Sequence, residues 1–210
     1  MLDAQAADLI LVSARIEGEG LAWFAVDSSA VECLPLAAYD LTRRQCRVRL
    51  VSCPARRLAG TGEASVRRVL DMAALALAVE ELGGAAACLD AATEYAKVRV
   101  QFGRAIGSFQ AVKHRLADTL IELELTRSLV EDCVSTVASK REDVSLLGSL
   151  AKVSASSTYQ RIAGDNIQVH GGIGYTWEHD AQLYFKRAFS GAGLFGTLDQ
   201  HRDNLAARAA

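Results

Sequence analysis

Prolines and aromatic residues are scarce in this chain of 210 residues, which has two prolines and 6% aromatic residues. Two prolines are too few for a proline-rich linker, and the length suits one large or two modest globular domains. The five cysteines are an odd number, have no C-x-x-C spacing and are accompanied by only four histidines. This pattern argues against a disulfide framework and a metal site, so we expect reduced thiols and a cytoplasmic protein.

An excess of charge of one sign is also absent. The chain has 23 basic and 25 acidic side chains, a net charge of −2 and a pI near 6.1. Nucleic-acid binding would need a clustered basic stripe. The one basic run, at residues 43–49, alternates with apolar residues near its end, which is typical of the solvated face of a strand. We therefore expect no nucleic-acid partner.

Long hydrophobic runs are missing as well. The longest apolar stretch, residues 72–79, stops at Glu80 and Glu81, and the N-terminus has no basic segment followed by an apolar one. A transmembrane helix needs about 20 apolar residues. We therefore expect neither a secretory signal nor a membrane span.

The spacing of apolar residues changes near residue 60. Short apolar segments at 9–14, 21–26, 31–34 and 46–53 predict a small antiparallel sheet. Beyond them, apolar residues recur every three or four positions and predict helices at 64–100, 108–139, 143–170, 178–190 and 195–208. The predicted fold is α+β and mainly α, with a partial antiparallel β domain at 1–60 and an antiparallel helical bundle at 61–210. The second helix is expected to bury Phe109, Val112, Leu116, Leu120, Leu123, Val130, Val134 and Val137.

The predicted helix ends carry recognisable signals. Ser108 and Asp143 are expected N-caps, and Gly171 with Gly172 is expected to end a helix. Glu178 and Asp180 stand where acidic side chains would cap the next helix and complement its dipole.

Two short segments set polar side chains beside glycines at predicted helix boundaries. They are Arg-Val-Gln-Phe-Gly at 99–103 and Gln-Val-His-Gly-Gly at 168–172. A guanidinium offers a planar fork of donors to phosphate oxygens, and glycines let backbone N–H groups approach an anion. The pair of segments therefore predicts a phosphate-binding site.

Together with Ile-Gly-Ser-Phe-Gln at 106–110, Gly-Gly-Ile-Gly-Tyr at 171–175 and Phe-Gly-Thr at 195–197, these segments resemble the C-terminal half of acyl-CoA dehydrogenases, a flavoenzyme family. In that family they reach across a subunit interface to the adenosine diphosphate half of a neighbour's FAD. The resemblance implies that Arg99 binds pyrophosphate, that Gln110 and Gln168 hydrogen-bond to the nucleotide, and that Gly171 and Gly172 present N–H groups. It adds Phe102, Phe109, Val169 and Thr197 to the wall of that site.

The resemblance fails at the catalytic base. Family members have Glu-Gly-Thr where this chain has Phe195-Gly-Thr, and a phenyl ring cannot accept a proton. The alternative base position on the long helix falls at Ala73, and the family's substrate-binding arginine is replaced at Ala74. Asp71 is the one nearby carboxylate, although its side chain is short. The expected set of catalytic residues is therefore empty.

The chain also resembles the family only from inside its β domain onward, because residues 3–15 match a strand that follows the segment surrounding the flavin ring. The resemblance implies a non-catalytic or truncated subunit that shares FAD with a related partner, which holds most of the acyl-CoA. Self-association, in which a second copy of this chain is the partner, is the other possibility. The alternatives are an enzyme with a non-standard base, such as Asp71, and a flavin-free helical scaffold.

Several of these residues also have plain structural interpretations. Arg99 could pair with Glu94 on a helix surface, and Phe102 and Phe109 could belong to the core. His170 is expected to be a hydrogen-bonded structural histidine. The remaining histidines, His114, His179 and His201, look isolated in the sequence and have no metal-ligand spacing.

Overall fold

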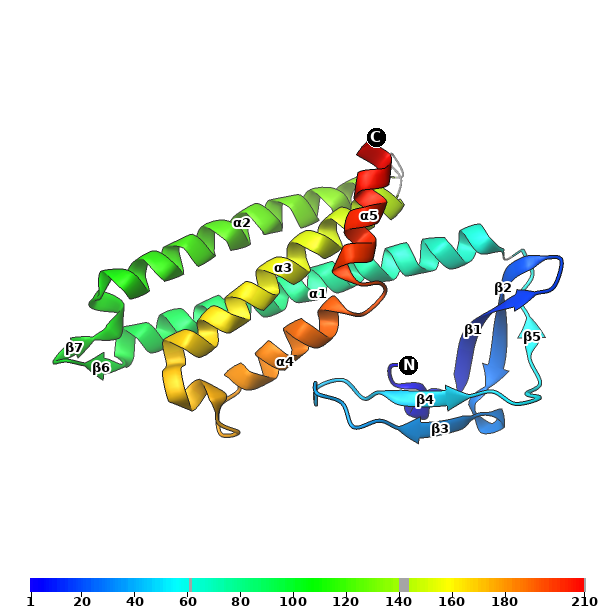
Figure 1. Cartoon of the computed structure of the whole chain (residues 1–210), viewed down its shortest axis with the longest axis horizontal. Coiled ribbons are helices and arrows are strands. Elements are labelled where there is room, and N and C mark those ends of the chain that lie inside the picture. Colours follow the sequence, from blue (N-terminus) through cyan, green and yellow to red (C-terminus); the bar gives the residue numbers. More distant parts are fainter. Residues whose placement is uncertain (61, 140–143, 210) are drawn as a thin grey trace. The chain divides into compact units, whose positions relative to one another are not determined.

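A computed structural model describes residues 1–60, 62–139 and 144–209 (Figure 1). The chain divides into two compact units, Met1–Leu70 and Asp71–Ala210, and each is described by itself. The predicted cap Asp143 lies outside the described residues. The domain boundary expected at residue 60 stays a prediction, since the first unit includes the first residues of the long helix α1 (Glu63–Val98).

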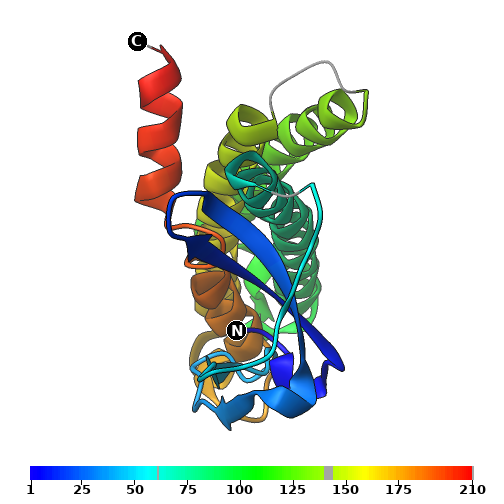
Figure 2. The ribbon, with the colours of Figure 1, turned by 90° about the vertical axis from the view of Figure 1, so that its right-hand side faces the viewer.

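The first unit is built from short antiparallel strands. β1 (Leu9–Ile16) pairs along its whole length with β2 (Gly20–Asp27), and β5 (Arg56–Arg57) adds to the other edge of β2. Figure 2 shows β1 and β2 as a twisted ribbon. β3 (Glu32–Pro35) and β4 (Cys46–Arg49) form a separate two-stranded sheet. Two 3-10 turns, η1 (Ala4–Ala6) and η2 (Ser28–Ala30), complete the unit.

Alternating burial gives this unit a small core. Ala4, Ile10 and Cys46 are buried, and partly buried Val12 and Val48 pack against them. Along β4 the side chains alternate between this core and solvent, so the two arginines of the strand are exposed, as predicted. The strand ends at Arg49, however, rather than at the predicted residue 53.

The second unit is a bundle of long helices. After α1 come the hairpin strands β6 (Val100–Gln101) and β7 (Arg104–Ala105), the 3-10 turn η3 (Ile106–Ser108) and α2 (Gln110–Ala138). They are followed by α3 (Val144–His170), η4 (Gly171–Tyr175), α4 (Ala181–Ala192) and α5 (Leu198–Ala209). The five helices and the small antiparallel sheets confirm the predicted fold class.

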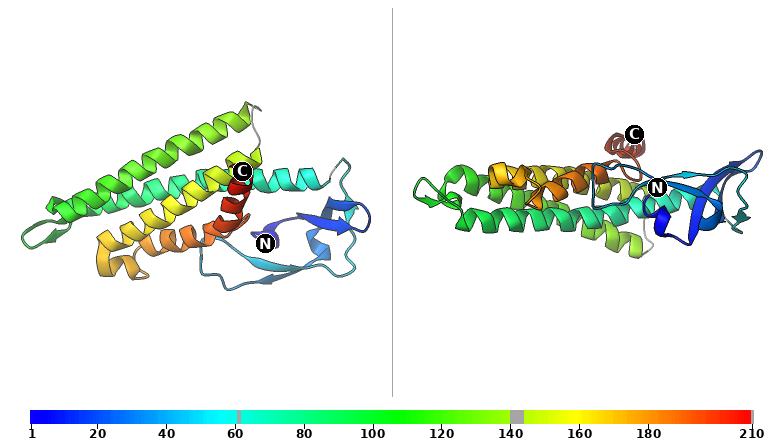
Figure 3. Two further views of the ribbon diagram at one scale, coloured as in Figure 1. Left: turned by 45° about the horizontal axis from the view of Figure 1, so that its top comes forward. Right: turned by 90° about the horizontal axis from the view of Figure 1, so that it is seen from below.

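Helix α3 is the centre of the bundle and packs against α2, α4 and α5. In Figures 1 and 3 it runs between α2 and α4. Small side chains allow this close packing: Ala151, Ala155 and Ala163 are each at most 1% exposed. At Gly84 of α1, an added Cβ would lie 2.5 Å from the ring of the buried Tyr159.

The buried face of α2 differs from the predicted one. Leu120 and Val134 are 49% and 38% exposed, whereas Thr119, Thr126 and Cys133 are buried. One series of buried and half-buried positions runs along α2 at alternating spacings of four and three residues: 112, 116, 119, 123, 126, 130, 133 and 137. The Thr126 hydroxyl lies 2.8 Å from that of Thr158 on α3. Small polar residues therefore occupy positions that a purely apolar criterion assigns to their neighbours.

A buried ion pair joins α1 to the rest of the bundle. Lys152 and Glu81 are both 0% exposed, and their side chains meet at 3.1 Å. Lys152 also donates to the carbonyl of Gly191 at 2.7 Å, and the Ser156 hydroxyl donates to Glu81 at 2.6 Å. Among the described helices, α1 is the one long and apolar enough to cross a membrane, and half of its most apolar window is buried inside the protein. The buried pair marks α1 as the core helix of a bundle.

Two predicted caps are wrong. Ser108 lies in η3, its hydroxyl is buried without a partner among the described residues, and Phe109 occupies the N-cap of α2 with no side-chain hydrogen bond. At α4, Asp180 is the N-cap residue but makes no side-chain cap, and the ring of His179 accepts the N–H of Ala181 instead. The predicted stop is confirmed: α3 ends at His170, and Gly171 adopts a φ of +66°.

Candidate functional site

The first motif forms a hairpin that the periodicity did not predict. Val100 pairs with Ala105 and Gln101 with Arg104, which leaves Phe102 and Gly103 as a two-residue turn. Both turn residues have positive φ, 52° and 78°. Two such residues in a row define a type I′ turn, in which asparagine and glycine are usual and phenylalanine is strained. Phe102 is 92% exposed, so its interpretation as a core residue is wrong.

Arg99 stands at the base of this hairpin. Its backbone N–H donates to Tyr95 at 2.9 Å, and its carbonyl accepts the N–H of Ile106 at 2.8 Å, which holds both ends of the hairpin together. Glu94 pairs with Lys97 at 2.5 Å and not with Arg99. Arg99 is exposed. Its guanidinium forms no ion pair with any residue that the structure describes.

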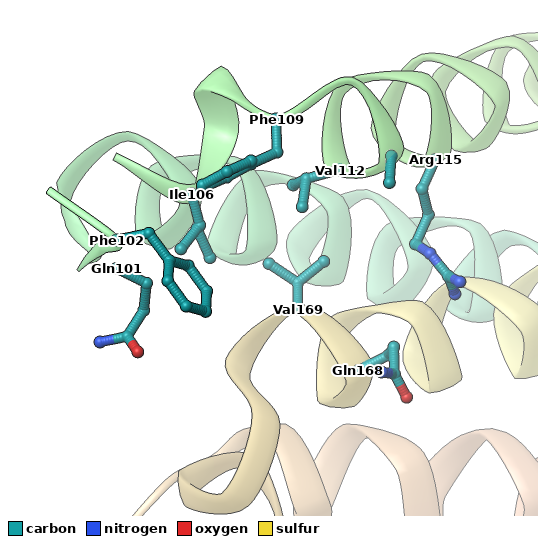
Figure 4. A pocket seen from close by; sticks show the side chains of 9 residues that line it. Gln101, Phe102, Ile106, Phe109, Val112, Arg115, Gln168 and Val169 are labelled. Carbon is teal, nitrogen blue, oxygen red and sulfur yellow. The ribbon is translucent and has the colours of Figure 1, made fainter. Parts of the chain in front are cut away.

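Beside the hairpin lies a hollow of about 380 Å³, which we call the slot (Figure 4). Apolar side chains dominate its walls, and the Phe102 ring meets the Phe109 ring edge-on at 6.2 Å between centroids. The Arg104 guanidinium lies 4.0 Å over the Phe109 ring. The lining residues come from the hairpin, η3, α2 and the end of α3: Gln101, Phe102, Ile106, Phe109, Ala111, Val112, Arg115, Gln168 and Val169.

The structure brings some of the predicted residues together and leaves others apart. Phe102, Phe109, Gln168 and Val169 line the slot, whereas Arg99 and Gln110 are exposed residues outside its lining. The two glycines that open η4 are exposed, with open space where a Cβ would stand. Thr197, the last of the predicted residues, does not line the slot either.

Thr197 caps helix α5. Its hydroxyl accepts the N–H of Gln200 at 3.3 Å, and the Gln200 side chain accepts the N–H of Thr197 at 2.8 Å. This reciprocal pair is a capping box. A contact of Thr197 with a nucleotide stays a prediction beside this structural role.

Four lining residues with long or branched side chains were missed by sequence reasoning: Gln101, Ile106, Val112 and Arg115. Val112 was expected in the helical core, and the helical spacing of Phe109 and Val112 was the available signal that they share a face. Arg115 carries no such local signal, because its partner Asp165 is 50 residues away.

A stack of rings supports the second motif. The His170 ring lies 4.3 Å from the Tyr95 ring and 4.3 Å from the His179 ring. His170 Nδ1 donates to the carbonyl of Asn166 at 2.8 Å, which confirms the predicted structural histidine. Burial lowers the pKa of His170, and the nearby His179 lowers it further against the hydrogen bond to Asn166. The prediction that His179 is isolated is wrong.

The position of the expected base is occupied by an aromatic ring on a strained backbone. Phe195 is 40% exposed with φ of 59°, and Gly196 follows with φ of 114°. His201, 8% exposed and therefore not isolated, donates from Nε2 to the Phe195 carbonyl at 3.2 Å and accepts from the Ser149 hydroxyl at Nδ1. Burial lowers the pKa of His201, while the Asp71 carboxylate acts in the opposite direction. The side chain at 195 itself has no proton acceptor.

Residues 60–210 match the family model described as "Acyl-CoA dehydrogenase, C-terminal domain". Acyl-CoA dehydrogenase IpdE2 of Mycolicibacterium smegmatis is 47% identical over 60% of this chain and 39% of the relative. Acyl-CoA dehydrogenase FadE34 of Mycobacterium tuberculosis is 42% identical over 83% of this chain and 24% of the relative. The chain therefore spans less than half the length of these relatives.

Solved structures show the same architecture. Butyryl-CoA dehydrogenase from Megasphaera elsdenii superposes with a TM-score of 0.92 at 23% identity, over 99% of this chain and 57% of that chain. A variant of the Tcur3481-Tcur3483 steroid ACAD superposes with a TM-score of 0.85 at 29% identity, over 96% of this chain and 55% of that one. The first likeness concerns the fold alone.

Proposed function

Because the chain belongs to the acyl-CoA dehydrogenase family, we propose that it is a catalytically incompetent subunit that completes the FAD site of a related partner chain. The partner would carry out the α,β-dehydrogenation of an acyl-CoA and hold most of that substrate. We also propose that the reaction takes place in the cytoplasm.

The phenyl ring at residue 195 carries this proposal. The family reaction begins with removal of a proton, and neither Phe195 nor Ala73 has an atom that accepts one. Losing a positioned general base costs roughly 10²–10⁴ in rate. His201 does not replace it, because the neutral ring already uses both nitrogens for hydrogen bonds to Phe195 and Ser149.

The slot and its surroundings suit the adenosine diphosphate half of FAD. Apolar walls and the Phe109 ring accommodate a flat heteroaromatic ring, and the exposed Arg99 offers a planar fork to a pyrophosphate. The backbone at Gly171 and Gly172 can be approached closely because nothing occupies the space of a Cβ. When bound, FAD supplies the hydride acceptor, and this chain holds its nucleotide end.

Exposure of the hairpin supports a site shared between chains. Phe102 is 92% exposed on a strained turn, so its ring contributes little to the stability of its own chain. Nearly the whole surface of the ring is available to a partner. Among the relatives, Caffeyl-CoA reductase-Etf complex subunit CarC of Acetobacterium woodii is named as part of a complex, and the Tcur3481-Tcur3483 steroid ACAD is named as a pair. A second, related chain is the partner that we propose, with self-association as the other form.

The visible absorption spectrum tests the proposal. We expect the chain to be colourless when purified alone and to acquire flavin absorbance when co-purified with a related, catalytically complete chain from its own source. Arg99→Gln should reduce the flavin retained by the complex. Arg127→Gln is the matched control, because Arg127 is an arginine of α2 that pairs with Glu124 and does not line the slot.

A gain-of-base variant separates this proposal from the alternatives. Phe195→Glu supplies the carboxylate, yet the chain alone should show no acyl-CoA dehydrogenation. Turnover by that variant alone, or flavin that acyl-CoA bleaches in the wild-type chain alone, would refute the proposal and favour an independent enzyme. Protein that stays colourless in every complex would favour a flavin-free scaffold.

A further inference from the structure

The polar end of the slot is formed by Arg115, a residue to which the motifs assign no role. Figure 4 shows its side chain extending from α2 toward the end of α3, where Gln168 lies. Arg115 and Ala111 also line a second, polar hollow of about 410 Å³, together with His114, Asp118, Arg161 and Asp165. Arg115 therefore separates an apolar compartment from a charged one.

The Arg115 guanidinium is held in place by a carboxylate. Arg115 Nη1 lies 2.6 Å from Asp165 Oδ1, and the Thr119 hydroxyl lies 3.2 Å from the other oxygen of Asp165. The Asp165 side chain is 14% exposed, whereas that of Arg115 is 46% exposed. The acid is thus largely covered, whereas the guanidinium is more exposed and has further N–H donors besides the one at Nη1.

The charges distinguish Arg115 from Arg99. Asp165 neutralises Arg115, so this end of the slot attracts an anion weakly but still presents N–H donors in a fixed plane. Arg99 has no acidic partner within the described residues. A phosphate is therefore better placed at Arg99, and a neutral group rich in acceptors is better placed at Arg115.

We propose that Arg115 is a ligand-binding residue of the slot that donates to acceptor atoms of the adenosine moiety, while Arg99 serves the phosphates. Asp165 and Thr119 are its positioning residues. A purine ring between the apolar walls presents unsubstituted ring nitrogens, and its ribose presents oxygens, both of which accept from a guanidinium. This inference rests on the proposed function, since it names the part of the nucleotide that each arginine holds.

The experiment compares adenosine with ADP on the full chain, by ligand-observed NMR titration. Arg115→Gln should weaken adenosine and ADP by about the same factor, roughly tenfold, as expected for a lost hydrogen bond from a charged donor. Arg99→Gln should weaken ADP and leave adenosine unchanged. Arg161→Gln is the matched control: Arg161 is similarly exposed and paired with Glu122, but does not line the slot.

Arg115→Lys is a control for the possibility that Arg115→Gln weakens binding by disturbing the fold. Lysine keeps a positive charge for Asp165 but lacks the planar fork, so adenosine binding should fall while the melting temperature stays near that of the wild type. Unchanged adenosine binding in both Arg115 variants would overturn the inference, as would no binding of adenosine by the wild-type chain. Neither result touches the proposed function, which is judged by flavin in the complex.

Discussion

Phe102→Asn should make the isolated chain more stable and its complex weaker. Phe102 has φ of 52° and is followed by Gly103 with φ of 78°. A left-handed backbone costs an ordinary L-residue about 1–2 kcal/mol, and Asn-Gly is the preferred pair in a type I′ turn. The ring offsets little of this cost, because it is 92% exposed and touches Phe109 only at an edge-on distance of 6.2 Å.

We expect Phe102→Asn to raise the free energy of unfolding by about 0.5–1 kcal/mol, measured by urea denaturation of the chain alone. The melting temperature should rise by about 2–3 °C. The same variant should retain less flavin in the complex, because it removes a wall of the slot and the exposed ring. Stability and assembly would then move in opposite directions.

Phe102→Ala is the control that separates ring from backbone. Alanine removes the ring but keeps a Cβ at positive φ, so the chain should be no more stable than the wild type. The reasoning would be refuted if Phe102→Asn lowered the free energy of unfolding by more than about 1 kcal/mol, because the ring would then stabilise its own chain.

Three further predictions concern the bundle. Lys152→Met should lower the free energy of unfolding by about 3–5 kcal/mol, because the buried Glu81 carboxylate would lose the positive charge that balances it. Adding Glu81→Leu should restore most of that loss in urea titrations, and an additive loss would contradict this account. Burial lowers the pKa of His170 from 6.5, so protons bind the unfolded chain more readily. The resulting stability is intact above about pH 6.5 and is lost as the pH falls through that value toward the folded pKa; His170→Phe should flatten this part of the curve in urea titrations. Gly84→Ala should destabilise the chain by about 1–2 kcal/mol in thermal melts, because its Cβ would meet a buried tyrosine ring at 2.5 Å, whereas Gly83→Ala, where space is open, should stabilise it.

The spacing of apolar residues predicted the fold well because burial follows it in most elements. The switch from short strands to long helices near residue 60 is confirmed, as is the end of α3 at the glycine pair. The burial of Thr119 and Thr126 was not predicted, because a small polar residue reveals its burial only through a partner on another helix, here Asp165 and Thr158. The sequence did not predict the short hairpin after α1, because its turn lacks the asparagine that is usual in a type I′ turn.

The candidate site was predictable only in its local part. The motif at 99–103 named Phe102, and the motif at 168–172 named Gln168, both of which line the slot. Arg115 depends on an ion pair with Asp165, and contacts between residues this far apart in the chain leave no local pattern. Thr197 was assigned to a ligand, and the structure shows its capping box with Gln200.

The hydroxyl pair of Thr126 and Thr158 has a consequence for how precisely the bundle assembles. Small apolar residues alone would let α2 slide along α3 by a turn with little penalty. Thr126 and Thr158 are each 4% exposed and their hydroxyls lie 2.8 Å apart, so a slip of one helix along the other would break this buried hydrogen bond. Residues of α2 and α3 both line the slot. The Thr126–Thr158 pair therefore helps to fix the alignment of the two helices that brings Phe109 and Val169 into the same lining.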